Sequence, residues 1–301
     1  MYENNEPRKC ILALGFFDGV HRGHAALISR AVARGRERGL PALAVTFDRH
    51  PAATVGGDAP GLLTSPEERR ELCGALGVSD TLFLPFDRAL CALPPEAFVR
   101  DLLCGRLHAA GVVVGENYTF GARRAGNARL LASLCSAEGI TFDCVPPVCD
   151  GGEPISSTRV REALLSAELC RANDLLGHPF ALRGMVEHGN EIGRLLSFPT
   201  ANLALSPELL LPASGVYRSL TRLSDGRRFP SVTNIGTRPT VDSDPCRTVE
   251  THVMDFSGNL YGEEIRVELL SYLRPVRRFA SREALSAQIR RDVAAARGEP
   301  L

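Results

Sequence analysis

The sequence predicts an α/β protein in which a doubly wound parallel sheet is followed by a small antiparallel β-barrel and a C-terminal helix. Short apolar runs alternate with helix-like segments over residues 1–179, a pattern typical of parallel strands joined by helical crossovers. Over residues 180–301 the strand-like runs instead follow one another directly, separated by glycine, proline and turn residues. Residues 281–296 then have the apolar spacing of an amphipathic helix. We therefore expect two domains, 1–179 and 180–301.

In the first domain, five apolar runs indicate strands. They are CILALGFF (10–17), LPALAVTF (40–47), TLFLPF (81–86), GVVVG (111–115) and ITFDCV (140–145). Helices are expected over 24–38, from Pro66 behind the capping residue Ser65, over 95–107 and over 127–138. Because ligands of doubly wound sheets bind beyond the carboxyl ends of the strands, we expect the site at that edge.

In the second domain, six runs indicate antiparallel strands. They are ALRGMVEHG (181–189), FPTANLAL (198–205), GVYRSLTRL (215–223), RRFPSVTNIG (227–236), TVETHVMDF (248–256) and EIRVELLSYL (264–273). Strands of this length joined by short turns are typical of a small barrel.

The composition excludes some classes of partner. The 301 residues contain 35 Lys plus Arg and 35 Asp plus Glu, so no global positive charge attracts nucleic acid or an anionic membrane. The first apolar run is too short for a signal peptide or a spanning helix. The nine cysteines form no CxxC pair, as expected of reduced thiols in a cytoplasmic protein. Lys9 is the only lysine and no P-loop sequence is present, so phosphate binding must depend on backbone amides, arginine, histidine or a metal.

The stretch GFFDGVHRGH (15–24) is the first candidate site. Its glycines permit close backbone approach, and the following helix would direct free amides at an anion, with His21 and His24 on one face of the first turn. Two alternatives stay open: an ordinary turn with exposed histidines, and a metal site that includes Asp18.

Three other segments end near the same sheet edge. TFDRHP (46–51) follows the second strand, and GENYTFGARRAG (115–126) follows the GVVVG strand. ISSTRVR (155–161) places hydroxyl side chains at a helix start with arginines behind them, which equally fits a well-capped helix.

These four segments together resemble the nucleotidylyltransferase superfamily, and more closely the bacterial bifunctional riboflavin kinase/FAD synthetases. In that family GxFDGxHxGH, TFxxHP, Gx(D/N)FxFG and ISSTxxR occur in this order. The resemblance implies catalysis by His21, His24 and Arg159, and a flavin contact at Tyr118. It also implies an ATP site lined by Gly15, Phe16, Asp18, Gly19, Asn117, Ser157 and Thr158. The chain departs from the family pattern at Arg49, Tyr118 and Asn127.

The second domain has its own polar motif. Pro199-Thr200-Ala201-Asn202 places a hydroxyl and an amide oxygen on one side of an extended segment, and such hard oxygen ligands suit Mg²⁺ bound to ATP phosphates. Glu250 lies on a later strand, where a carboxylate can deprotonate a hydroxyl. A polar loop and a solvent-facing glutamate are the alternative.

The whole second domain resembles the riboflavin kinase module. It contains LPASGVY, TNIGTRPT, VETHVMDF, YGEEI and LRPVRRF in family order, behind GNEIGRLLSFPTANL (189–203). The resemblance implies that Thr200 and Asn202 are Mg²⁺/ATP ligands, that Glu250 is the catalytic base and that Arg274 contacts the flavin. It also implies that Gly193 and Arg194 bind ATP, while Ser197 stands where the family usually has glycine.

The resulting expectation is a cytoplasmic Mg²⁺-dependent enzyme that converts riboflavin to FMN and FMN to FAD with ATP as co-substrate. It would bind neither nucleic acid nor membrane and would be a monomer or a weak homo-oligomer. Two rivals are a nucleotidylyltransferase for another small phosphoester and a non-enzymatic RNA-binding barrel protein. The even charge balance and the 6% aromatic content disfavour the RNA-binding protein.

Overall fold

The computed structural model describes residues 9–54, 56–188, 198–238 and 246–298. The chain divides into two compact units, one made of residues 1–60 and 66–156 and the other of residues 61–65 and 157–301. Each unit contains one of the two expected architectures. The second unit also includes two helices ahead of the barrel, α7 (Ser157–Leu165) and α8 (Leu169–Leu176). The domain boundary at 179/180 stays a prediction.

The first unit is built on a five-stranded parallel sheet with the order β3-β2-β1-β4-β7. The strands are β1 (Cys10–Leu14), β2 (Ala42–Phe47), β3 (Asp80–Leu84), β4 (Ala109–Gly115) and β7 (Thr141–Val145). The direction of winding reverses between β1 and β4, and the carboxyl ends of strands at such a point form the usual ligand crevice of this fold.

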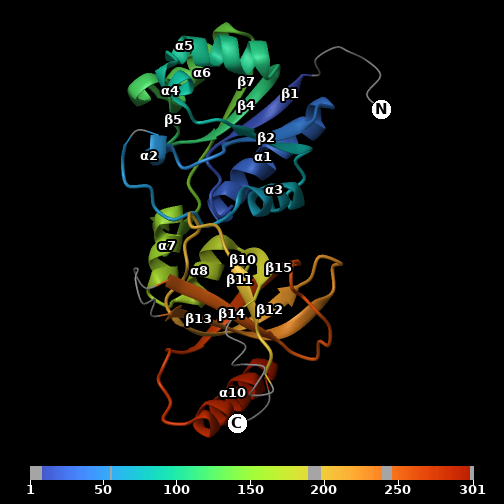
Figure 1. The fold of residues 1–301 in the computed structure, drawn as a ribbon. Helices are drawn as coiled ribbons and strands as arrows, with labels where there is room; N and C mark the ends of the chain where they lie inside the picture. Colours follow the sequence, from blue (N-terminus) through green and yellow to red (C-terminus); the bar gives the residue numbers. More distant parts are fainter. Residues whose placement is uncertain (1–8, 55, 189–197, 239–245, 299–301) are drawn as a thin grey trace. The chain divides into compact units, whose positions relative to one another are not determined.

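Helices cover both faces of this sheet, which confirms the doubly wound prediction (Figure 1). On one face Leu27 and Ile28 of α1 pack with Ile11 and Ala13 of β1. On the other face a cluster of buried side chains joins β1 and β4 to two other helices. The helices are α1 (Arg22–Arg38), α2 (Pro51–Thr54), α3 (Pro66–Ala75), α4 (Arg88–Ala92), α5 (Pro95–Ala97), the π-helix η1 (Phe98–Arg106), the 3₁₀-helix η2 (Ala122–Arg124) and α6 (Ala128–Ala137). Two short hairpins, β5–β6 (Thr119–Phe120, Gly126–Asn127) and β8–β9 (Cys149–Asp150, Glu153–Pro154), complete the unit.

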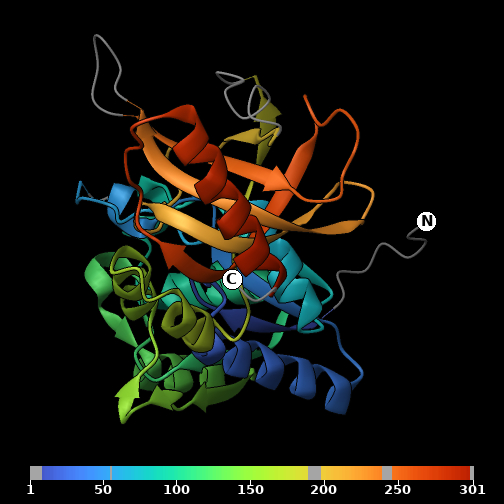
Figure 2. The same cartoon turned by 90° about the horizontal axis from the view of Figure 1, so that it is seen from below.

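The second unit contains a closed six-stranded antiparallel barrel with the order β10-β11-β14-β13-β12-β15. The strands are β10 (Phe180–Glu187), β11 (Ala201–Ala204), β12 (Gly215–Arg222), β13 (Arg228–Arg238), β14 (Cys246–Val253) and β15 (Glu264–Arg274). The final helix α10 (Arg282–Arg297) lies across the barrel strands (Figure 2). It buries Ala296 against Val216 and Val232 on the outer face of the barrel.

The barrel interior is partly polar, and this fixes which side chains point outward. Ser219 is hydrogen-bonded to Ser231 at 2.8 Å and to Thr233 at 2.7 Å, and all three side chains are buried. Thr233 in turn is hydrogen-bonded to Thr251. Because side chains alternate along a strand, the neighbours of these inward hydroxyls, among them Asn234 and Glu250, face the outer surface that α10 partly covers.

Helix α8 is attached to the barrel closely enough to affect where a barrel fragment should begin. Asn173 donates from its amide to the Leu269 carbonyl at 3.0 Å and accepts from the Phe180 backbone N–H at 2.8 Å. Leu169, Ala172, Leu175 and Leu176 are buried. We expect a fragment that starts at Ser157 to unfold at a higher temperature than one that starts at Leu182, as measured by circular dichroism. Equal melting temperatures would contradict a stabilising role of these helices.

Candidate active sites

The turn between β1 and α1 has an unusual backbone. The expected strand over 10–17 ends at Leu14, and the following residues Phe17, Gly19 and Val20 have φ values of 53°, 79° and 39°. The left-handed conformation is strained for residues with a side chain, particularly for β-branched valine. Phe17, Asp18 and Val20 are nevertheless buried, so the surrounding packing holds the turn in this shape. A Cβ on Gly15 would lie 2.6 Å from the Phe17 ring, which explains why glycine is needed there.

The two predicted histidines lie together at the start of α1. His21 is the N-cap residue, and its Nδ1 accepts a hydrogen bond from the His24 backbone N–H at 3.3 Å. The imidazole rings are stacked, with centroids 3.7 Å apart. Among the described residues, the buried Nδ1 of His24 has no hydrogen-bond partner. The structure therefore places two imidazoles at the amino end of a helix, where the helix dipole favours an anion.

Both imidazoles are held in the neutral form. Burial lowers the pKa of His21 from 6.5 to about 4. Burial also lowers the pKa of His24 well below 6.5, and the nearby charges of His21 and Arg69 act in the same direction. A neutral imidazole still donates one N–H to an anionic oxygen, and a bound anion would favour its protonation.

These pKa shifts predict acid sensitivity of the first unit. Since the pKa of His21 is about 4 in the folded protein and 6.5 when exposed, the unfolded chain binds the extra proton first as pH falls. The contribution of the neutral His21 to the stability of the folded protein is therefore complete above pH 6.5 and is lost as pH falls toward about 4. In denaturant titrations at pH 7 and pH 5, His21→Asn should lose less stability than the parent, because asparagine caps helices and does not titrate. Equal pH dependence in both proteins would contradict this.

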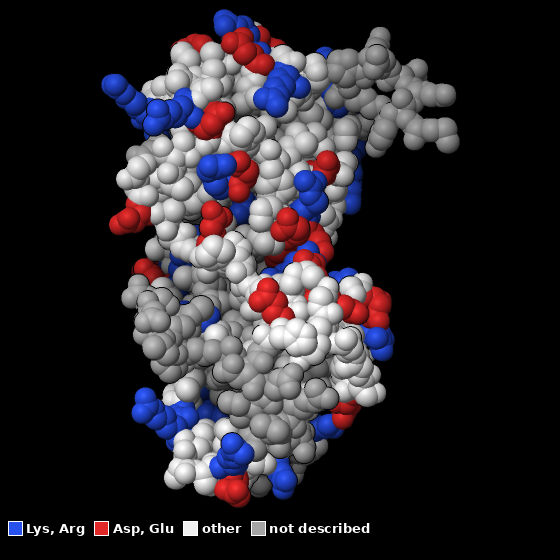
Figure 3. Space-filling view, in the orientation of Figure 1, with Lys and Arg blue, Asp and Glu red and all other residues white. Residues whose placement is uncertain are grey.

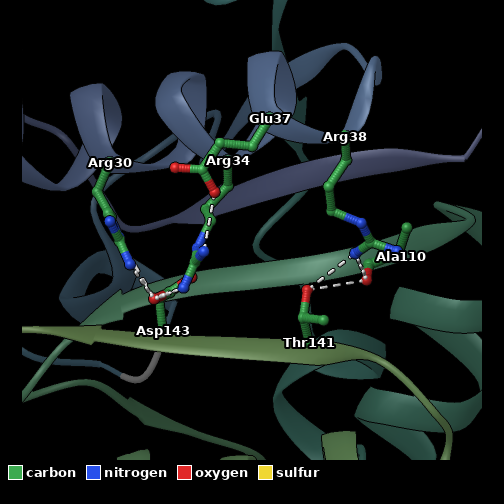
Figure 4. A network of polar contacts seen from close by, with 7 residues as sticks. All are labelled: Arg30, Arg34, Glu37, Arg38, Ala110, Thr141 and Asp143. Atoms are coloured by element: carbon green, nitrogen blue, oxygen red, sulfur yellow. Dashed lines mark hydrogen bonds and ion pairs between the residues drawn. The ribbon is translucent and has the colours of Figure 1, made fainter.

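Helix α1 is held onto the sheet by arginines on one of its faces (Figure 4). Arg30 donates to an Asp143 carboxylate oxygen at 2.8 Å, and Arg34 donates to the same carboxylate at 2.6 Å. Arg38 donates to the Ala110 carbonyl at 2.7 Å. These contacts join α1 to β4 and β7 and so fix the helix that carries His24.

The other predicted residues of the first unit surround the same turn or the end of β4. Phe16 lies edge-on to His50, and Asp18 is buried. Asn117 is exposed in the turn that follows β4. Tyr118 lines an aromatic cavity of about 330 Å³. The other lining residues include Phe47, Phe86, Phe98 and Phe120.

Ser157, Thr158 and Arg159 begin α7 and belong to the second compact unit. Ser157 and Arg159 are partly buried and Thr158 is exposed. Their participation in the same site as the histidines stays a prediction.

The second site lies on the outer face of the barrel. The strand register places Asn202 of β11 directly opposite Glu250 of β14, and Glu250 directly opposite Asn234 of β13. Directly paired residues of antiparallel strands share a face, so these three polar side chains form a row. The register continues from Asn234 through Val216 to Arg274.

Part of this row opens into a cavity of about 340 Å³ beneath α10. Thr200, Asn234, Glu250 and Arg274 line it together with the aromatic residue Phe279. Asn202 instead lines a neighbouring cavity, and Thr200 also lines a third one near Tyr261. Of the predicted residues, Thr200 and Glu250 thus share one cavity, and Asn202 lies beside Glu250 in the register. Gly193 and Arg194 lie outside the described residues, as does Ser197.

Three polar residues near these sites, Asp292, Asn234 and Arg69, were not identified in the sequence. Asp292 of α10 accepts two hydrogen bonds from the Arg274 guanidinium, at 2.9 Å and 2.6 Å. Asn234 joins the polar row only through strand register. Arg69, on α3, is buried beneath the β1–α1 turn. No short motif identifies Asp292 or Arg69, whereas Asn234 lies within the quoted segment TNIGTRPT and could have been singled out there.

The described residues on the face shown in Figure 3 have no dominant charge. On the face shown in Figure 3, acidic and basic side chains are interspersed. Among the described residues, none of the helices has the length and apolar character needed to cross a membrane. The described part of the chain also contains no cluster of three His, Cys, Asp or Glu side chains suited to a metal ion.

Comparisons with known proteins match both units. The FAD synthetase family model matches residues 3–159, and the riboflavin kinase family model matches residues 176–299. The bifunctional riboflavin kinase/FMN adenylyltransferase of Escherichia coli strain K12 is 41% identical over 96% of this chain and 92% of its own length. The protein of the same name from Pseudomonas fluorescens is 37% identical over 97% of this chain and 93% of its own.

The fold also matches a solved structure. A crystal structure described as a macrolide-efflux protein from Streptococcus pneumoniae has a TM-score of 0.88 and 30% identity, covering 99% of this chain and 97% of that one. Together, the two matching domains and the full-length relatives show that this chain belongs to the bifunctional riboflavin kinase/FMN adenylyltransferase family.

Proposed function

We propose that the family's two reactions occur at two separate sites of this chain, adenylyl transfer at the β1–α1 turn and riboflavin phosphorylation on the outer face of the barrel. The observation that carries this proposal is the presence of two independent polar constellations. The stacked His21 and His24 lie within the segment that matches FAD synthetase, and the row of Asn202, Glu250 and Asn234 lies within the segment that matches riboflavin kinase.

At the β1–α1 turn, the ATP phosphates would lie at the amino end of α1. A phosphate oxygen of FMN attacks the α-phosphorus of ATP, a new P–O–P bond forms, and the bond to the β-phosphate oxygen breaks to release pyrophosphate. The FMN phosphate is already an anion, so this step needs no protein base. The side-chain contribution would be positioning and charge stabilisation by His21, His24 and Arg159, with Gly15, Phe16, Asp18, Gly19, Asn117, Ser157 and Thr158 around the nucleotide.

The aromatic cavity lined by Tyr118 suits the flavin ring of FMN. Its lining of Phe47, Phe86, Phe98, Tyr118 and Phe120 offers flat apolar surfaces to a flat ring system. Tyr118 lies shortly after the end of β4, next to Asn117 at the carboxyl edge of the sheet. We assign the flavin side of the adenylyl-transfer site to this cavity.

In the barrel, Glu250 would act as the general base. It takes the proton from the 5′-hydroxyl of riboflavin, the hydroxyl oxygen attacks the γ-phosphorus of ATP, and ADP leaves. Thr200 lines both the cavity of Glu250 and the cavity near Tyr261, so the flavin in one cavity and the nucleotide in the other could both reach this residue. Gly193 and Arg194 are further candidates for the ATP site. The ion pair with Asp292 would hold the Arg274 guanidinium at the flavin cavity.

The donor set of the barrel site fits Mg²⁺. A threonine hydroxyl, an amide oxygen and a carboxylate are hard oxygen ligands, and Thr200 and Asn202 would hold the ion. When bound, Mg²⁺ neutralises charge on the ATP phosphates.

Asn202→Ala should lower the rate of riboflavin phosphorylation strongly and raise the Mg²⁺ concentration needed for half-maximal rate, because one oxygen ligand is removed. The measurement is a Mg²⁺ titration of FMN formation. Asn127→Ala, which removes an exposed amide at the start of α6 in the other compact unit, is the matched control with an unchanged Mg²⁺ requirement. A parent-like titration of the Asn202 variant would contradict the ligand assignment.

The state of the cysteines bears on the cellular location. The eight cysteines whose side chains are described are all free thiols, which supports a cytoplasmic location. We propose a monomer or a weak homo-oligomer that acts on riboflavin, FMN and ATP, without a nucleic-acid partner. Incubation with riboflavin, ATP and Mg²⁺ followed by flavin chromatography tests the proposed function, and a protein that makes neither FMN nor FAD would refute it.

A further inference from the structure

Arg69 of α3 is the most deeply buried basic side chain near the β1–α1 turn, with 1% of its surface exposed. One guanidinium nitrogen donates to the Thr46 hydroxyl at 3.2 Å and to the Phe47 carbonyl at 3.1 Å, both at the end of β2. The guanidinium carbon lies 4.6 Å from the centre of the Phe16 ring. Another nitrogen is 3.8 Å from an Asp18 carboxylate oxygen. Arg69 therefore contacts both the end of β2 and the turn that carries the histidines.

Thr46 extends this connection to the backbone of the turn. Its hydroxyl accepts from Arg69 and donates to the Phe16 carbonyl at 2.5 Å. The chain Arg69–Thr46–Phe16 thus holds the residue immediately before the left-handed Phe17. A turn with three left-handed residues is strained and persists only where contacts with the surrounding structure hold it in place. Arg69 provides several such contacts to the β1–α1 turn.

The cost of burying the Arg69 guanidinium argues against a purely structural role for this residue. Removing a charge from water is costly, and a well-packed apolar residue often serves stability equally well. Among the described residues, Nε and one terminal nitrogen of Arg69 make no hydrogen bond, and Asp18 lies beyond hydrogen-bond distance. The fold therefore retains a buried charge that its own partners satisfy only in part.

We propose that Arg69 is a positioning residue for adenylyl transfer, which fixes the β1–α1 turn against the end of β2 so that His21 and His24 meet the nucleotide phosphates in reactive geometry. This inference rests on the assignment of adenylyl transfer to the turn. The Arg69 charge also contributes to the lowered pKa of His24, so the same residue helps to keep that imidazole neutral before the nucleotide binds.

The test uses the full-length protein and measures kcat and KM for FMN in FAD formation, the melting temperature, and FMN formation from riboflavin as an internal reference. Arg69→Gln should lower kcat of FAD formation on the order of 10²-fold while KM for FMN stays unchanged, because a small displacement of catalytic groups costs about this much. Arg69→Lys, which keeps the charge, should recover part of the loss. Arg70→Gln changes the adjacent arginine, which is exposed and paired with Asp80, and should behave as the parent.

Thr46→Val keeps the inference testable if Arg69→Gln does not fold. It removes the hydroxyl between Arg69 and Phe16 at nearly constant volume and should lower kcat about tenfold, as expected for a lost hydrogen bond to a charged group. Parent-like kcat in folded Arg69→Gln or in Thr46→Val would overturn the inference. So would losses that merely follow the unfolded fraction at the assay temperature. The His24→Ala variant, assayed in parallel, separates a failure of the Arg69 inference from a failure of the site assignment. Full FAD formation in that variant would refute the assignment of adenylyl transfer to the β1–α1 turn.

Discussion

Glu250→Gln is expected to stop FMN formation from riboflavin while FAD formation from supplied FMN continues. A general base contributes about 10²- to 10⁴-fold to a rate, and glutamine keeps the size of the side chain but cannot accept the hydroxyl proton. Glu250 lines the barrel cavity and lies in one row with Asn202 and Asn234, whereas the histidine turn belongs to the other compact unit. The measurement is initial-rate flavin chromatography with riboflavin and with FMN as separate substrates.

Glu264→Gln is the matched control for this experiment. Glu264 begins another barrel strand, and its side chain is 52% exposed beside Arg183. The control variant should phosphorylate riboflavin at the parent rate. A Glu250→Gln protein that is folded and still makes FMN at the parent rate would remove Glu250 from the mechanism.

His24→Ala is expected to have the opposite effect, so that FMN accumulates from riboflavin and little FAD forms. Loss of one preorganised contact to developing charge costs on the order of 10²-fold or more in rate. The His24 imidazole stacks on His21 at the amino end of α1. Under the proposed assignment, the variant loses one donor to the ATP phosphates.

The control for His24 is His108→Asn. His108 precedes β4 and so lies at the opposite edge of the parallel sheet from the turn. Its φ of 50° is left-handed, and asparagine tolerates that conformation better than most residues. This variant should make FAD at the parent rate, and FAD formation at the parent rate by His24→Ala would show that the histidine turn is not the adenylyl-transfer site.

The architecture could be predicted because the spacing of apolar residues along the chain reflects which faces of the helices and strands are buried. Strands such as GVVVG are buried on both faces and read as continuous apolar runs, and α1 shows its buried stripe in Leu27, Ile28, Ala31 and Val32. The end of β1 was placed three residues late, because Phe16 and Phe17 continue the apolar run. Phe17 is indeed buried, but it lies in a left-handed turn rather than in the strand.

The candidate sites were predictable only where their residues are close in sequence. His21 and His24 belong to one helix start, and Thr200 and Asn202 to one extended segment. Arg69 reaches the turn from α3, and Asp292 reaches Arg274 from α10. Such contacts depend on packing between distant elements, and an arginine or aspartate on a helix is usually a solvated residue. Strand register placed Asn234 beside Glu250, and register cannot be read from one strand alone.

Two separate sites in one chain are the central claim of this account. The most direct test mixes the Glu250→Gln and His24→Ala proteins with riboflavin, ATP and Mg²⁺ and follows the flavins by chromatography. The account predicts that neither variant alone makes FAD from riboflavin, whereas the mixture does, because FMN released by the His24 variant is adenylylated by the Glu250 variant. A mixture of folded proteins that makes no more FAD than the separate variants, although FMN is present in solution, would contradict the two-site account.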